Sequence, residues 1–206
     1  AKASQVLSSH GYAMLLVCSQ NEPSKDVDYL RFLSRRQVSG LIVSTAANGP
    51  EITTSFIRKL GLPTIMLDRD CPDAPTVGAV QTDHKSGMEK AVSHLLKIGH
   101  SRIAMIGGKD FLYPVHQRLA GYRAAFKRTD RLVDESLIRS VGFDAELAFA
   151  ATMELFALNQ RPTALIAAGN MILTGVLQAL QDLEIRVGRD LALIGCDDTA
   201  IARLYS

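Results

Sequence analysis

The segment His94-Leu-Leu-Lys-Ile-Gly-His-Ser-Arg-Ile-Ala-Met-Ile-Gly-Gly108 joins an amphipathic helix to a buried strand. Apolar residues recur at helical spacing from Met88 to Leu96, and Gly99 can take the left-handed turn that ends a helix. Ile103–Ile106 then form a continuous apolar run, which is typical of a strand covered on both faces. A helix followed at once by such a strand is the repeating unit of an α/β protein.

The same alternation of helix and strand runs through the rest of the chain. The expected strands are Ala13–Cys18, Leu41–Ser44, Thr64–Leu67, Val77–Val80, Ile103–Ile106, Ile138–Val141, Ala164–Ala167 and Leu191–Ile194. Between them the apolar residues recur at helical spacing, and Asp144 and Asn170 are the expected N-caps of two helices. Alternation of this kind predicts parallel sheets joined by right-handed crossovers. The predicted fold class is α/β.

The sequence divides near residues 80–83, where a new series of alternating strands and helices begins. We expect two lobes, residues 1–81 and 82–206, with a ligand cleft between them. Residues 1–10 resemble the second half of a helix, so the first lobe is expected to lack its first strand. The second lobe is expected to lack its C-terminal return, because the chain stops soon after its last strand.

Open α/β sheets bind ligands beyond the carboxyl ends of their strands. The polar or small residues at those positions are Ser19, Asp68, Asp83, Gly107–Gly108, Asn170 and Asp197. Asp68 and Asp197 are the strongest candidates for ligand contacts, because a carboxylate can accept two hydrogen bonds from vicinal hydroxyls of a sugar. The alternative for each is an exposed loop acid or a helix cap.

Two further side chains suit the same chemistry. Arg118, expected near the start of a helix, offers a rigid fork of donors that fits hydroxyl pairs or a carboxylate. Its alternative is a solvated arginine. Phe143 follows an expected strand and could stack on a sugar face, or it could be an ordinary core phenylalanine.

Composition excludes several classes of protein. The chain has 206 residues, 47% of them hydrophobic and 21% charged, with a formal net charge of +2. These fractions are ordinary for a globular chain and do not indicate a nucleic-acid surface within it. We find no apolar run of the roughly 20 residues that span a bilayer. The 3 cysteines form no CxxC pair, which favours a reducing compartment.

Catalytic motifs are not found. Gly107–Gly108 completes neither GxGxxG nor the P-loop pattern, so it is interpreted as a tight exit turn from a strand. The 5 histidines have no metal-ligand spacing, and the sequence lacks a GxSxG nucleophile elbow. We therefore expect no enzyme activity, no metal site and no cofactor.

Several segments taken together resemble the effector-binding core of LacI-type bacterial transcription regulators. They are Pro63-Thr-Ile-Met-Leu-Asp68-Arg69, Thr82-Asp83-His84-Lys-Ser-Gly87, His94–Gly108, Arg118-Leu-Ala-Gly121-Tyr122, Arg161–Ala168, Gly175–Leu180 and Ala192-Leu-Ile-Gly-Cys-Asp197-Asp198, in family order over essentially the whole chain. The sequence departs from the usual pattern at His84, at Gly169-Asn170 and at Cys196, which leaves the identity of the ligand open.

The resemblance implies two Rossmann-like lobes of the periplasmic-binding-protein-like type that clamp a small-molecule effector. It implies a cytoplasmic homodimer, with dimer versus tetramer left open, whose separate N-terminal helix-turn-helix domain binds operator DNA. Ligand-contact positions carried over by motif are Asp68, Arg118, Phe143, Asn170 and Asp197, with Asp83 near the first hinge crossing. The ligand class is a sugar or sugar derivative, with a purine as an alternative. The competing function is a periplasmic sugar-binding protein of a transport system, which shares the two-lobe clamp.

Overall fold

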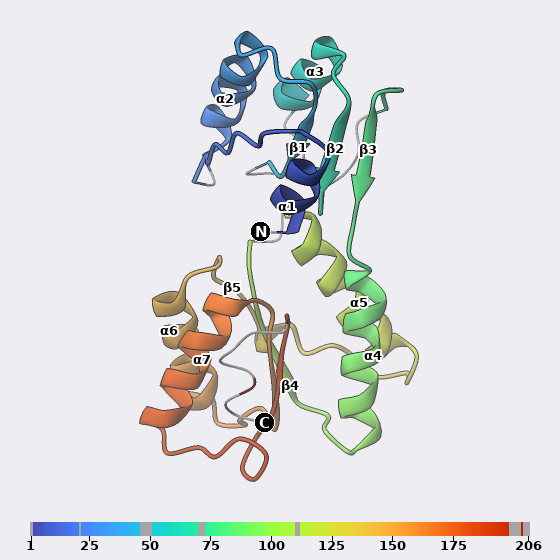
Figure 1. Cartoon of the computed structure of the whole chain (residues 1–206). Helices are drawn as coiled ribbons and strands as arrows, with labels where there is room; N and C mark the ends of the chain where they lie inside the picture. Colours follow the sequence, from blue (N-terminus) through green and yellow to red (C-terminus); the bar gives the residue numbers. More distant parts are fainter. Residues whose placement is uncertain are drawn as a thin grey trace. The chain divides into compact units, whose positions relative to one another are not determined.

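The computed structural model describes residues 2–20, 22–45, 51–69, 73–109, 112–197 and 203. These residues fall into two compact units, Ala1–Val80 and Gln81–Ser206 (Figure 1). Asp198 lies outside the described residues. Both units contain parallel sheets flanked by helices, so the predicted α/β class is confirmed.

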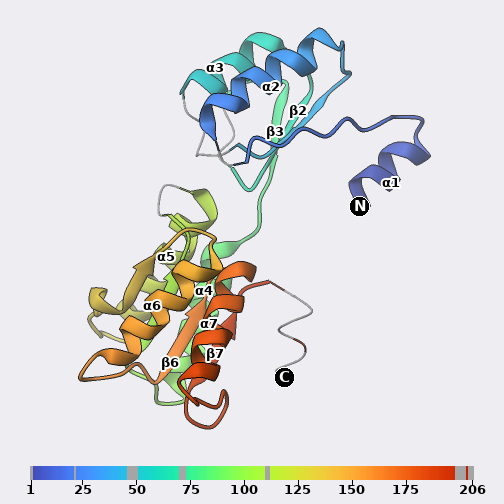
Figure 2. The ribbon, with the colours of Figure 1, turned by 90° about the vertical axis from the view of Figure 1, so that its left-hand side faces the viewer.

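The first unit is a three-stranded parallel sheet with helices packed on one face. Its elements are α1 (Lys2–Ser9), α2 (Pro23–Arg35), β1 (Leu41–Val43), α3 (Glu51–Leu60), β2 (Thr64–Leu67) and β3 (Val77–Val80), with strand order β1-β2-β3. Figure 2 shows α2 and α3 lying along the same side of this sheet. Leu30 of α2, Ile57 of α3 and Met66 of β2 form the buried core between them.

The opposite face of this sheet is also apolar but is exposed. Ile42 pairs with Ile65, and Leu67 pairs with Val80, so all four side chains project from one face. Their exposed fractions are 50%, 40%, 39% and 61%. Continuous apolar runs are typical of strands covered on both faces, but the described residues of β1 and β2 are covered on one face only.

The apolar run Ala13–Cys18 is not a strand in the structure, which corrects the sequence prediction. Met14, Leu15 and Leu16 are exposed by 46%, 52% and 78%. An apolar run has high β-propensity, but a strand forms only when a neighbouring strand satisfies its backbone groups. No described segment pairs with residues 13–18.

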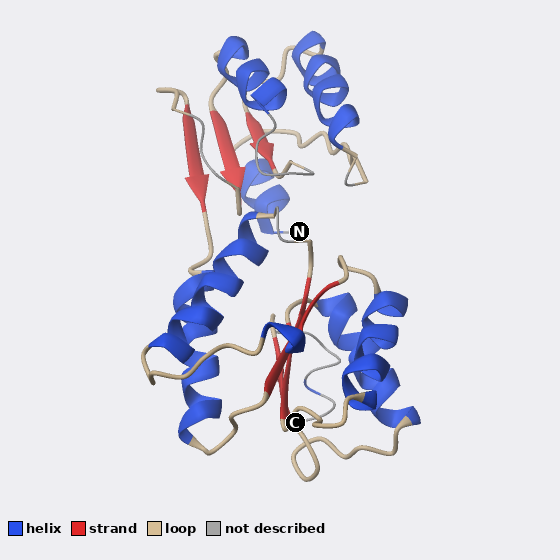
Figure 3. Cartoon of the chain, turned by 180° about the vertical axis from the view of Figure 1, so that it is seen from behind, coloured by secondary structure: helices blue, strands red, loops and turns tan. Residues whose placement is uncertain are grey.

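The second unit has a four-stranded parallel sheet between two pairs of helices (Figure 3). Its elements are α4 (His84–Lys97), β4 (Ile103–Gly107), α5 (Tyr113–Lys127), a 3-10 turn (Glu135–Leu137), β5 (Ile138–Ser140), α6 (Ala145–Ala157), β6 (Ala164–Ala167), α7 (Asn170–Asp182) and β7 (Ala192–Gly195). The strand order is β5-β4-β6-β7. All the strands predicted for this unit are present, with ends that differ by at most one residue.

Two apolar cores hold the layers of this unit together. One joins α6 and α7 to the sheet, and the other joins α4 and α5 to its opposite face. Every residue of β4 and β6 is buried, as their continuous apolar runs predicted. The hydroxyl of buried Tyr122 donates to the carbonyl of Ile103 over 2.7 Å, and burial raises the pKa of this phenol.

Of the three residues predicted at helix ends, two have the predicted role in the structure. Gly99 has a φ of +100° after α4, and Asp144 caps α6 by accepting a hydrogen bond from the backbone N–H of Leu147 over 2.9 Å. Asn170 is the first residue of α7 and not its N-cap, which is Gly169. No described helix is long and apolar enough to cross a membrane.

Glycines let the helices of each pair in this unit cross at close range. A β-carbon at Gly121 of α5 would overlap the carbonyl oxygen of Lys85 in α4, and one at Gly175 of α7 would overlap the carbonyl oxygen of Ala145 in α6.

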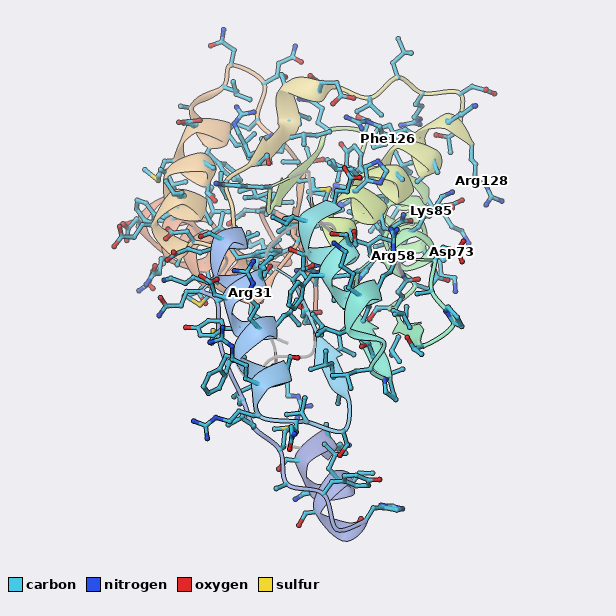
Figure 4. The ribbon with its side chains drawn as sticks, turned by 90° about the horizontal axis from the view of Figure 1, so that it is seen from above. Arg31, Arg58, Asp73, Lys85, Phe126 and Arg128 are labelled. Carbon is cyan, nitrogen blue, oxygen red and sulfur yellow. The ribbon has the colours of Figure 1, made fainter. Side chains whose placement is uncertain are left out.

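At the end of α5, Phe126 is buried, whereas Arg128 reaches the periphery and pairs with Glu89 over 2.8 Å (Figure 4).

Replacing either glycine by alanine is therefore expected to destabilise the fold. Because backbone atoms cannot move aside as a side chain can, Gly121→Ala and Gly175→Ala should each lower the free energy of unfolding by about 1–3 kcal/mol. Gly87→Ala is the matched control, since Gly87 lies in α4 and its added β-carbon meets no atom within 4 Å. That variant should gain up to about 1 kcal/mol from helix propensity. Chemical denaturation checks all three, and equal effects would contradict the crossing geometry.

Candidate ligand-binding site

Parallel pairing brings the carboxyl ends of four strands to one edge of the second unit. Ile106 pairs with Ala167 on one side and with Arg139 on the other, and Ala167 pairs with Gly195. The residues that follow these positions therefore share that edge of the sheet. Such an edge is where open α/β sheets bind their ligands.

Arg118 is the buried charge at this edge. Its side chain is only 8% exposed, and Nη1 donates to the carbonyl oxygen of Ala168 over 2.9 Å. Nη2 lies 3.8 Å from Oδ1 of Asp197, whose side chain is 52% exposed. A buried guanidinium is stabilised by acceptors of this kind, and bonds from a charged donor are stronger than neutral ones.

The sequence prediction for Arg118 is corrected in one respect. α5 begins at Tyr113, five residues before the expected start, with Pro114 in its first turn. Arg118 therefore lies inside the helix, and the alternative of a solvated arginine at a helix start is wrong. The guanidinium instead reaches from α5 to the end of β6.

Asp68 and Asp197, in different units, have the same backbone conformation. Asp68 directly follows β2 with a φ of +47°, and Asp197 lies two residues after β7 with a φ of +74°. This left-handed region is uncommon for residues with a β-carbon, although aspartate tolerates it better than most. Gln20, Gln37, Asp130 and Glu184 also have positive φ, so this conformation alone does not mark a binding site.

Arg69 holds the turn at Asp68 in the first unit, a contribution that the sequence prediction missed. Its Nε donates to the carbonyl of Thr45 over 2.8 Å, and its Nη1 donates to the carbonyl of Asp68 over 2.7 Å. Burial lowers the pKa of Arg69, while the charges of Asp68 and Asp26 act in the opposite direction. The signal in the sequence was the arginine next to the candidate aspartate.

Phe143 lies at the candidate edge and not in the core. It follows Gly142, which has a φ of +80°, and precedes Asp144, the N-cap of α6. Its side chain is 43% exposed, although its ring approaches the backbone of Gly108 and Gly169. The alternative of an ordinary core phenylalanine is therefore wrong, and an aromatic surface faces outward.

Asn170 and Asp83 occupy helix starts. Asn170 opens α7 and is exposed, and its carbonyl accepts a hydrogen bond from the hydroxyl of Thr174 over 3.2 Å. The carboxylate of Asp83 caps α4 by accepting from the backbone N–H of Ser86 over 3.1 Å, which lowers the pKa of Asp83. Asp83 thus has a structural role, and its part in ligand binding stays a prediction.

The structure thus groups Arg118, Asp197, Phe143 and Asn170 at one edge of the second unit. A guanidinium, a carboxylate, an amide and an aromatic face can together bind a polar ring that carries hydroxyl groups.

Two cavities of about 710 and 350 Å³ in this unit are lined by other residues, one near Leu177–Val187 and one beside Arg139. Among the described residues, no three His, Cys, Asp or Glu side chains group as metal ligands.

Residues 92–206 match the family described as periplasmic binding protein-like domain. The chain belongs to that family. The matched residues lie in the second unit and do not include the first unit.

Proteins similar to this chain are transcription regulators. The HTH-type transcriptional regulator DegA of Bacillus subtilis is 30% identical over 94% of this chain, and the HTH-type transcriptional repressor PurR of Vibrio atlanticus is 26% identical over 95%. The chain spans 58% of the length of both relatives. A LacI family regulator from Enterococcus faecium, solved with bound ribose, is 24% identical with a TM-score of 0.83 over 98% of this chain and 72% of its own. The expected resemblance to LacI-type regulators is confirmed.

The thiol of Cys196 offers a test of the electrostatics of this site within the periplasmic binding protein-like domain. Burial raises the pKa of Cys196, the charge of Arg118 lowers it and the charge of Asp197 raises it. Asp197→Asn should therefore lower that pKa, so that the pH profile of thiol alkylation at Cys196 shifts to lower pH. Mass spectrometry of iodoacetamide-labelled peptides measures the profile.

Cys18 is exposed and is labelled in the same experiment, so its modification reports the overall extent of the reaction. An unchanged profile at Cys196 would contradict the placement of the Asp197 carboxylate beside the thiol.

Proposed function

We propose that the chain is the effector-binding domain of a bacterial transcription regulator of the LacI type, and that its effector is a sugar or sugar derivative. The observation that carries the proposal is the pairing of buried Arg118 with Asp197 at the sheet edge where Phe143 is exposed. A fixed donor and an acceptor can bind neighbouring hydroxyls, while the ring can cover the apolar face of a sugar. The ribose in the Enterococcus faecium regulator supports a sugar in this fold.

The candidate ligand contacts lie in both units. Asp68 lies at a strand end of the first unit, and Arg118, Phe143, Asn170 and Asp197 belong to the second. An effector can shift an equilibrium between two conformations of the regulator only by its difference in affinity for them.

Control of transcription is the proposed consequence. Operator DNA would be bound by a helix-turn-helix domain joined to this chain, in a cytoplasmic homodimer. The names of DegA and PurR support this assignment over that of an exported sugar-binding protein. Since both relatives are named as regulators or repressors, they also support a domain that binds its ligand without converting it.

Arg118→Ala tests the proposed site directly. Removing the guanidinium would leave the carbonyl of Ala168 and the hydroxyls of the ligand without their charged donor, so affinity should fall by about 2 kcal/mol or more, roughly 30-fold. Calorimetric titration of the wild type with a panel of monosaccharides identifies the sugar, and the same titration of Arg118→Ala gives the loss.

Arg123→Ala is the matched control. Arg123 lies on the same helix, but its exposed guanidinium pairs with Glu135 over 2.9 Å. Its replacement should leave the dissociation constant unchanged, because exposed ion pairs contribute little and the group is not part of the site. Equal affinity of the wild type and Arg118→Ala, with circular dichroism showing both folded, would remove Arg118 from the site.

A further inference from the structure

Gly108 and Gly169 lie opposite each other at the ends of adjacent strands. Ile106 of β4 pairs with Ala167 of β6, and each glycine stands two residues further along its chain. The backbone N–H of Ala168 donates to the carbonyl of Ile106 over 2.9 Å, so the pairing continues to the end of the strands. Both glycines are buried.

Backbone conformation does not require glycine at either position. Gly169 has a φ of 162°, which is extended backbone that any residue can adopt. Gly108 is not among the glycines with positive φ. The physical reason for glycine at these two positions must therefore lie in what surrounds them.

The ring of Phe143 occupies the space that a β-carbon would need. A β-carbon at Gly108 would lie 2.8 Å from Cζ and 2.9 Å from Cε2 of Phe143, and one at Gly169 would lie 2.9 Å from Cδ1 and 3.0 Å from Cε1. All four distances are shorter than ordinary contacts between carbon atoms. The ring thus spans both glycines, with one edge against each.

The loop that carries Phe143 is itself fixed at both ends. The backbone N–H of Val141 donates to the carbonyl of Gly107 over 2.9 Å, and the hydroxyl of Ser140 donates to the carbonyl of Gly108 over 2.8 Å. On the other side, Asp144 caps α6. Because the backbone of this loop is held at both ends, the ring can accommodate an added methyl group only by rotating away from the strand ends.

We propose that Gly108 and Gly169 are positioning residues that seat the ring of Phe143 across the ends of β4 and β6, with its exposed part turned to the ligand. The contact of the ring with Gly108 and Gly169, which we call the seat, is a property of the second unit alone. The identity of what the ring contacts rests on the proposed function. A methyl group at either glycine would move the ring off the seat and remove the aromatic wall without unfolding the sheet, because the clashing atoms belong to a partly exposed side chain.

Proton NMR of the full chain tests the seat without any ligand. One α-hydrogen of each glycine points where a β-carbon would be, so the ring current of Phe143 should displace both resonances from the ordinary glycine range, upfield for a hydrogen over the ring face and downfield for one beside its edge. Phe143→Leu should return them to the ordinary glycine range. In Gly169→Ala the resonance of Gly108 should move toward its position in Phe143→Leu, because the ring has left both glycines together.

Gly107→Ala is the matched control. A β-carbon at Gly107 would meet its nearest neighbours, Met105, Ala168 and Val115, at ordinary distances of 3.6–3.9 Å. This variant should therefore leave the resonances of Gly108 and Gly169 in their wild-type positions. Gly169→Ala is preferred to Gly108→Ala, since a β-carbon at Gly108 would also lie 3.0 Å from Cγ2 of Val115.

Two results would overturn the proposal. One is an ordinary α-hydrogen shift for both glycines in the wild type. The other is a resonance of Gly108 that stays in place in Gly169→Ala, which would mean that the ring does not span both positions. If the shifts appear as expected but no monosaccharide binds the wild type, the proposed function fails while the seat stands.

Sugar affinity gives the functional result. Where the wild type binds a monosaccharide, Gly169→Ala and Phe143→Leu should each weaken binding by about threefold to tenfold, the size expected for an aromatic contact. The double variant should bind no more weakly than Phe143→Leu alone, because both changes remove the same wall. Additive losses would overturn the positioning role of Gly169.

Discussion

The parallel pairing of β4 with β5 and β6 is the constraint on which the candidate site depends. Three strands that run in the same direction must end at the same edge, so the turns after them meet there. β4 and β6 are buried throughout, which fixes that edge within the unit. Arg118 then connects the helix after β4 to the end of β6 through the carbonyl of Ala168. Pairing, burial and one charged hydrogen bond together position the polar groups.

The two units carry related features at their strand ends. Asp68 and Asp197 both have left-handed backbone, and each has an arginine near it: Arg69 at the first and Arg118 at the second. In each unit the arginine contacts the aspartate, Arg69 through the carbonyl of Asp68 and Arg118 through the carboxylate of Asp197.

Much of this fold could be predicted from the sequence, because its determinants are local. Continuous apolar runs predicted β4 and β6, and the Asp144 cap fixed the start of α6. The run at Ala13–Cys18 was misjudged, since a strand depends on a partner that local sequence does not specify. The exposed position of Phe143 and its contact with two glycines depend on β5 and β6 lying on either side of β4, which spacing along the chain cannot reveal.

The most direct test of the proposed function measures the operator DNA affinity of the full-length protein with and without the sugar. The operator is selected from random DNA, and the sugar is the monosaccharide that binds the wild type. We expect saturating sugar to change the dissociation constant for the operator about fivefold or more, the lower range of typical allosteric coupling. The change should be smaller in Arg118→Ala at that sugar concentration, because a site with roughly 30-fold weaker affinity is less occupied. Unchanged operator affinity of the wild type at saturating sugar would contradict the account.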